Sequence, residues 1–145
     1  MTFERSEIVC RPAASGQGGS AAIDPQRETL IVPCGVKRAM AFIEANLGTS
    51  IRVIDLCAAA NLSPRTLFKQ FSDFAGTTPM GWLRRRRLQR VRAELEAGTT
   101  DSVTTVALRW GMTHLGRFAG DYRCEFGELP SRTLQRARRR DITSG

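Results

Sequence analysis

The chain has 145 residues, 41% of them hydrophobic and 7% aromatic, enough for one modest domain or two small subdomains but not for a large two-domain enzyme. Residues 1 to 33 hold 3 of its 22 basic and 4 of its 14 acidic residues, which leaves 19 basic against 10 acidic residues in positions 34 to 145. This localised positive charge indicates a polyanionic partner, with nucleic acid the leading candidate, because each neutralised phosphate releases condensed counterions.

The sequence predicts neither a membrane span nor a signal peptide. No stretch approaches the run of about 18 apolar residues that a span requires. Four charged residues interrupt the place where the apolar core of a signal peptide would lie: Glu4, Arg5, Glu7 and Arg11. We therefore expect a cytoplasmic protein with no membrane partner.

Residues 1–33 show no sustained periodicity, and the stretch from Pro12 to Ala22 is rich in Gly, Ala, Ser and Gln. This composition predicts a linker or a disordered tail. The short apolar run Leu30 to Val32 leaves open a second interpretation, in which the segment is the remnant of an upstream domain.

Helical periodicity begins at Cys34. Apolar residues lie on one face of the first predicted helix up to Leu47, and Gly48 follows as the expected C′ residue. A second helix is predicted from about Arg52 to Ala60.

Two Ser/Thr-Pro pairs predict the starts of the next helices. Ser63 and Pro64 supply an N-cap and a proline at N1, where its missing N–H costs nothing. Thr78 and Pro79 repeat the signal for a long helix that continues to Gly98 and spans roughly 28 Å. This helix would connect the two halves of the chain.

Three further helices are predicted, over about 102–109, from near Thr113 to before Gly127, and from Pro130 to Arg140, with a disordered tail over 141–145. No segment alternates like a strand. The predicted fold is therefore all-α with seven helices, in a domain over residues 34–140.

The segment 53–79 recurs as 103–130. The offset is 50 residues before the inter-helix turn and 51 after it, so that Leu67 corresponds to Phe118. One extra residue in a turn leaves both helical faces intact, and the duplication predicts two helix-turn-helix subdomains joined by the connector helix.

In the first subdomain, the second helix places Leu67, Phe71 and Phe74 inward. Arg65 and Lys69 then point outward and Phe68 lies on the flank. Such a face suits the DNA major groove, where Arg can bind guanine O6 and N7. The alternative is that these charges only solvate a surface.

The corresponding helix of the second subdomain places Phe118, Tyr122 and Phe126 inward, so Gly116 and Gly120 lie on the opposite face. The glycines either allow close approach of the backbone to the duplex or leave this helix mainly a positioning role, and we favour the second. Flanking them are Arg117, the best candidate for a base contact, and Leu115, which could touch a thymine methyl.

No enzyme chemistry is expected. His114 is the only histidine, and the four cysteines have no CxxC spacing, so we predict no catalytic residue, no metal and no cofactor. The arginines of the connector, Arg84 to Arg87, Arg90 and Arg92, should pair in part with acids, and those of the last helix should contact phosphate.

Several motifs occur in an order that resembles the DNA-binding domain of the AraC/XylS family of bacterial transcription regulators: Val53-Ile-Asp-Leu-Cys-Ala-Ala-Ala-Asn-Leu-Ser-Pro-Arg-Thr-Leu67, Gly76-Thr-Thr-Pro79, Val106-Ala-Leu-Arg-Trp-Gly-Met112 and Phe126-Gly-Glu-Leu-Pro130. The resemblance covers about residues 34 to 137. It implies two recognition helices that enter successive major-groove segments of double-stranded DNA. By position it assigns base reading to seven residues: Arg65, Phe68, Lys69, Leu115, Gly116, Arg117 and Gly120.

Phe68 and the two glycines depart from the polar residues usual at those positions, and Trp110 replaces a small residue and is expected to be buried. The resulting hypothesis is a sequence-specific regulator, an activator if it contacts RNA polymerase, which is cytoplasmic and nucleoid-associated when bound. A nonspecific or architectural DNA-binding protein is the alternative. Family members usually carry a separate effector or dimerisation domain, so the chain is either a stand-alone protein or part of a longer one, and its residues support no effector ligand.

Overall fold

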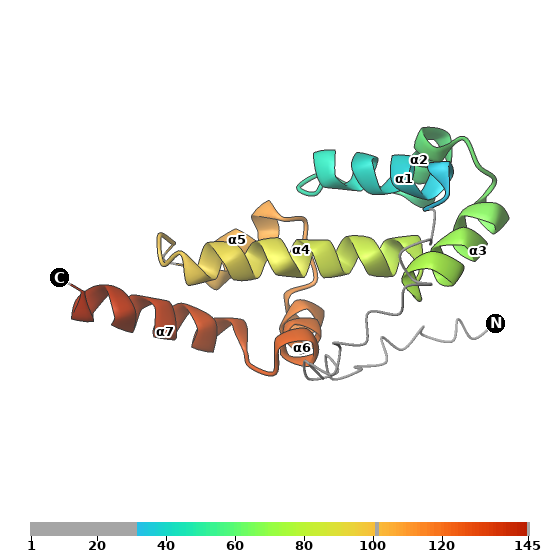
Figure 1. Cartoon of the computed structure of the whole chain (residues 1–145). Helices are drawn as coiled ribbons and strands as arrows, with labels where there is room; N and C mark the ends of the chain where they lie inside the picture. The colour runs from blue at the N-terminus through green and yellow to red at the C-terminus, as the bar shows by residue number, and fades with distance from the viewer. Residues whose placement is uncertain (1–31, 101, 145) are drawn as a thin grey trace. The chain divides into compact units, whose positions relative to one another are not determined.

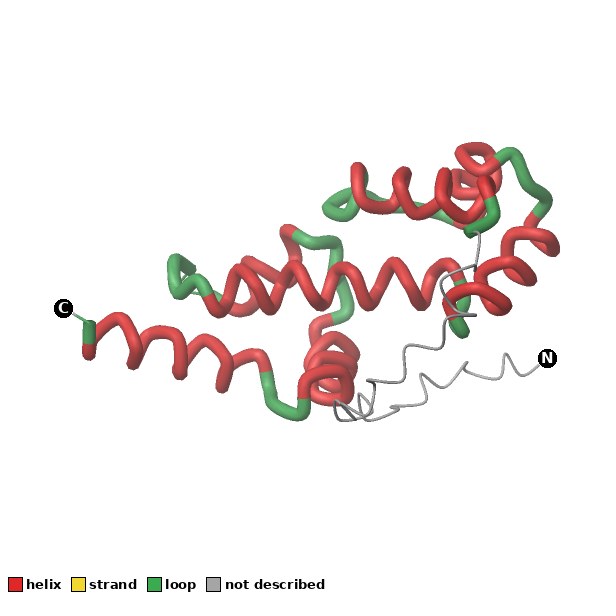
Figure 2. The backbone as a smooth tube through the Cα atoms, viewed as in Figure 1, coloured by secondary structure: helices red, strands yellow, loops and turns green. Residues whose placement is uncertain are grey.

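The computed structural model describes residues 32–100 and 102–144, and within these ranges every regular element is a helix (Figures 1 and 2). The all-α prediction with seven helices is confirmed. The helices are α1 (Cys34–Ala45), α2 (Val53–Ala60), α3 (Pro64–Ala75), α4 (Pro79–Glu96), α5 (Val103–Arg109), α6 (Leu115–Phe126) and α7 (Pro130–Thr143). The predictions for residues 1–31 fall outside the described part of the chain.

The described residues form two compact units that divide at Arg86 and Arg87, within α4. The first unit contains α1, α2, α3 and the start of α4, and the second contains the rest of α4 with α5, α6 and α7. Each unit therefore holds one of the predicted helix-turn-helix pairs. None of the described helices combines the length and apolarity that crossing a bilayer would need.

The predicted helix starts are confirmed by their hydrogen bonds. The hydroxyl of Ser63 accepts a bond from the backbone N–H of Thr66 at 3.3 Å, and Pro64 occupies the first turn of α3. The Thr78 hydroxyl accepts the N–H of Gly81 at 3.0 Å at the start of α4. These side chains satisfy N–H groups that have no partner within the helix.

Two helix ends differ from the prediction. Helix α1 stops at Ala45, and Gly48 does not adopt the expected positive φ, because the Asn46 side chain already donates to the Phe42 carbonyl at 2.8 Å. Helix α7 runs on to Thr143, so the predicted tail over 141–145 is wrong for residues 141–143.

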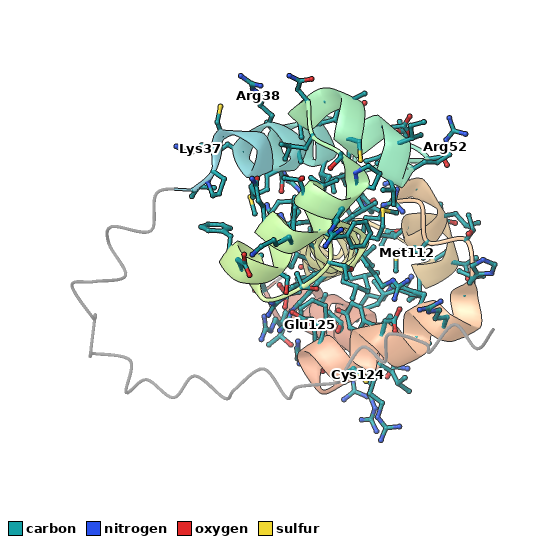
Figure 3. All side chains as sticks on the ribbon, turned by 90° about the vertical axis from the view of Figure 1, so that its right-hand side faces the viewer. Lys37, Arg38, Arg52, Met112, Cys124 and Glu125 are labelled. Carbon is teal, nitrogen blue, oxygen red and sulfur yellow. The ribbon has the colours of Figure 1, made fainter. Side chains whose placement is uncertain are left out.

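In the first unit, α1 packs against α2 and α3. The core side chains of this unit are Val36, Ala39, Ile43, Leu47, Ile51, Leu56, Cys57, Ala60, Leu67, Phe71 and Leu83. Charged side chains lie outside this core, as Figure 3 shows for Lys37, Arg38 and Arg52, which point away from the helices. The segregation is that of an ordinary amphipathic bundle.

In the second unit, α5, α6 and α7 pack against one another, with one face of α4 completing the core. Its hydrophobic core cluster consists of Leu88, Val91, Leu95, Val106, Ala107, Met112, Phe118, Tyr122 and Leu134. Trp110 is only partly buried, contrary to the prediction. Its indole N–H donates to the Glu94 carboxylate at 2.8 Å, which keeps one edge of the ring at the polar surface.

Candidate nucleic-acid interface

Helix α3 buries one face and exposes the opposite one. Leu67 and Phe71 are completely buried, whereas Arg65 and Lys69 are exposed. Phe68 is 37% exposed on the flank between them. The predicted orientation of all these side chains is confirmed, and the outward face of α3 is cationic with one aromatic edge.

Lys69 has an acidic neighbour on the same helix. Its ammonium donates to the Asp73 carboxylate at 2.8 Å, and this hydrogen bond, with the attraction of the opposite charges, raises the pKa of Lys69 above its ordinary value. The two side chains are 74% and 65% exposed. Exposed pairs of this kind contribute little to stability, so the ammonium can exchange this partner for a DNA oxygen at small cost.

Helix α6 also places its aromatic side chains inward, as predicted. Phe118 is 3% exposed and Tyr122 is completely buried. Leu115, the first residue of α6, is 38% exposed although it lies in line with Phe118 and Tyr122, whereas Arg117, whose side chain is 58% exposed, points outward. The outward face of α6 therefore carries the guanidinium of Arg117, and Leu115 is exposed only at the start of the helix.

The guanidinium of Arg117 lies 4.0 Å from the Asp121 carboxylate, one helical turn away. Gly116 and Gly120 are exposed, and a Cβ atom built on either would meet no atom of residues 32–100 or 102–144 within 4 Å. His114 is the N-cap residue of α6, and its side chain makes no capping bond.

A series of hydrogen bonds holds α6 on its buried side. The Tyr122 hydroxyl donates to the Thr133 hydroxyl at 2.8 Å, and Thr133 in turn donates to Glu128 at 2.8 Å. Arg136 binds the same carboxylate with two bonds of 2.8 and 2.9 Å. Since Thr133 is completely buried, this series ties α6 to α7 through the interior of the second unit.

The pKa shifts follow from these contacts. Burial raises the pKa of Tyr122, which stays a neutral donor. Burial would also raise the pKa of Glu128, but the hydrogen bonds from Thr133 and Arg136 outweigh it and lower the pKa below its ordinary value. Glu128 is therefore a stable anion at neutral pH.

Arg92 of α4 also contacts α6. The guanidinium carbon of Arg92 lies 4.6 Å from the centre of the Phe126 ring, and its Nε donates to Glu96 at 2.8 Å. The Glu96 hydrogen bond, which outweighs desolvation, raises the pKa of Arg92. Sequence reasoning missed these bracing roles, because the residues involved lie on three different elements.

Many of the remaining arginines pair with acids. Arg86 pairs with Glu44, and Arg109 pairs with Glu94. On α7 the exposed basic residues are Arg132, Arg136, Arg138, Arg139 and Arg140. The first unit thus exposes the outward face of α3, and the second unit exposes the outward face of α6 and a basic α7.

The sequence matches the family model described as a helix-turn-helix domain over residues 56–136. It is 50% identical over 104 residues to the XylDLEGF operon transcriptional activator 2 of Pseudomonas putida, a match that covers 70% of this chain and 66% of the relative. The chain belongs to the AraC/XylS family. A further XylDLEGF operon transcriptional activator of the same organism is 44% identical over 105 residues, which cover 71% of this chain and 33% of that relative. The chain thus spans less than two thirds of the first of these relatives and about a third of the second.

Solved structures agree with this assignment. A probable AraC family transcriptional regulator from Rhodopseudomonas palustris is 43% identical, with a TM-score of 0.68 over 71% of this chain and 96% of that one. The DNA-binding domain of AdpA, a global transcriptional factor solved in complex with a target DNA, is 29% identical, with a TM-score of 0.65 over 74% of this chain and 96% of that one. The described residues therefore form the AraC-type DNA-binding domain of a transcription regulator.

Proposed function

We propose that the chain binds specific double-stranded DNA by placing α3 and α6 in successive major-groove segments. The observation that carries this proposal is the outward face of α3, where Arg65 and Lys69 are exposed opposite the completely buried Leu67 and Phe71. A helix with this division of faces fits a groove whose floor offers guanine O6 and N7. The match to a domain solved with its target DNA supports the same use of the fold.

Each recognition helix has its own candidate contacts. Arg65 and Lys69 donate to base edges or phosphates and Phe68 packs against the groove wall. Leu115 touches a thymine methyl and Arg117 donates to a base edge, while Gly116 and Gly120 lie between them on the face of α6. The exposed arginines of α7 bind phosphates without carrying sequence information.

The length of α4 suits this arrangement. Its 18 residues span about 27 Å. Adjacent major-groove segments on one side of a duplex are about 34 Å apart. The connector helix with its flanking turns has the reach that two recognition helices on one side of the DNA require.

Selection of bound sequences from random duplexes tests the proposal. We expect two preferred half-sites about one helical turn apart, one for each recognition helix. A selected pool with no base preference would overturn the claim of specificity.

A nonspecific or architectural binder is the second candidate, and the exposed arginines of α7, which can bind phosphates without reading bases, favour it. Salt titration against matched and scrambled sites separates the two functions. Both binders lose affinity steeply with salt, but only the specific binder keeps a gap between the two sites.

The regulatory outcome that we propose is activation through contact with RNA polymerase in the bacterial cytoplasm, with the protein nucleoid-associated when bound and without enzymatic activity. The support is that the Pseudomonas putida relatives carry the name of transcriptional activators. Transcription in vitro with purified polymerase tests this directly. A rise in transcript from a promoter that carries the selected site is the expected result, and repression would contradict it.

A further inference from the structure

Glycine inside a helix needs a reason, because it weakens the helix relative to alanine. The described helices contain four such residues: Gly35, Gly81, Gly116 and Gly120. At Gly35 a Cβ atom would collide with the Leu62 side chain, and at Gly81 it would lie 2.6 Å from the Thr77 hydroxyl. Packing within the protein accounts for these two glycines.

It does not account for Gly116 and Gly120. Among the described residues, a Cβ atom at either position would meet nothing within 4 Å, and neither residue has a positive φ. These two glycines, four residues apart on one exposed face, lower the stability of α6 without improving its packing against the described residues. Packing among the described residues does not explain these two glycines, whereas close contact with a molecule that binds to this face would.

The repeat shows how unusual this face is. With the offset of 51 residues, Gly116 occupies the position of Arg65 and Gly120 that of Lys69. One recognition helix thus presents two cations where the other presents no side chain at all. A helix that served only to hold phosphates would gain from lysine or arginine at these positions, and would gain stability from alanine.

We infer that Gly116 and Gly120 are specificity determinants that let the backbone of α6 lie against the base edges. This inference rests on the proposed function. Since the glycine face offers no side-chain donor or acceptor, the group it receives is apolar, and the apolar group that projects into the major groove is the thymine C5-methyl. The half-site of α6 therefore contains thymine at the positions under the glycines.

The variants Gly116→Ala and Gly120→Ala test this inference. Because each new methyl group enters open space, we expect unchanged helical circular dichroism and a Tm raised by a few degrees. Affinity for the selected site should nevertheless fall by about tenfold or more, the loss of one good contact, while affinity for a scrambled site stays constant. Thr104→Ala, an exposed position on α5, is the control for helix stabilisation alone. Unchanged or tighter specific binding by both glycine variants would overturn the inference.

A second measurement separates this inference from the function on which it rests. Thymine in the α6 half-site is replaced by deoxyuridine, which lacks only the methyl group. We expect the wild-type protein to lose affinity and Gly116→Ala/Gly120→Ala to lose much less, a coupling that a double-mutant cycle reports. Wild-type binding that is specific but insensitive to deoxyuridine refutes the glycine contact and leaves the proposed function intact. Wild-type binding without any sequence preference refutes both.

Discussion

Removal of the Thr133 hydroxyl tests directly what stabilises the second unit. This hydroxyl is completely buried, accepts from Tyr122 and donates to Glu128. Thr133→Val keeps the shape of the side chain and removes both bonds. The change therefore leaves the buried Tyr122 hydroxyl without its acceptor, while Glu128 keeps its two bonds from Arg136.

The expected cost follows from the group that is left without a partner. A buried hydroxyl that loses its only partner costs about 1 to 3 kcal/mol, and we expect about 2 kcal/mol for Thr133→Val. In a domain of this size that corresponds to a fall in Tm of roughly 10 °C. Urea and thermal unfolding followed by circular dichroism measure both quantities.

The double variant Tyr122→Phe/Thr133→Val sharpens the test. Removing both partners leaves no unsatisfied buried hydroxyl, so the double variant should be more stable than Thr133→Val alone. Thr133→Ser, which keeps the hydroxyl, is the control. If Thr133→Val unfolds within about 0.5 kcal/mol of the wild type, the ordinary effect of a surface substitution, then the hydrogen-bond chain does not stabilise the unit as argued.

Three further outcomes are expected. Arg65→Ala should cost about 1 to 3 kcal/mol at one operator position and relax the preference there, which competition between single-base variants of the site measures; equal losses on all of them would contradict base reading. Replacing both Arg139 and Arg140 with alanine should weaken matched and scrambled sites alike and lower the salt slope, and a selective loss on the matched site would be evidence against phosphate contact. The pKa of Glu128 is lower in the folded protein than in the unfolded chain. Ionised Glu128 therefore contributes its full stabilisation at pH values above its pKa in the unfolded chain, and this stabilisation is lost as the pH falls through its pKa in the folded protein. Glu128→Gln should therefore lose less free energy of unfolding than the wild type on acidification below about pH 4. If the free energy of unfolding falls equally with pH in both proteins, Glu128 does not stabilise the fold through its charge.

Local signals in the sequence were sufficient for much of this fold. The pairs Ser63-Pro64 and Thr78-Pro79 begin helices where predicted, since a cap and a proline act on the adjacent turn alone. Burial of Leu67 and exposure of Arg65 follow from helical periodicity, which also requires no knowledge of the partner helix.

Features that depend on contacts between helices could not be predicted from local sequence signals. The series from Tyr122 through Thr133 to Glu128 joins two helices and a turn, and no spacing rule relates three such residues. Trp110 was expected in the core, but Glu94 on another helix provides an acceptor for its indole and holds it at the boundary. The end of α1 was missed because the side chain of Asn46 takes the role that Gly48 was expected to have.

The pair formed by Lys69 and Asp73 affects how salt titrations of this protein should be interpreted. In the proposed complex the ammonium of Lys69 turns toward DNA, and the carboxylate of Asp73 would then attract a sodium or potassium ion from solution. That uptake cancels part of the ion release from the duplex, so the salt slope underestimates the true number of phosphates that the protein contacts.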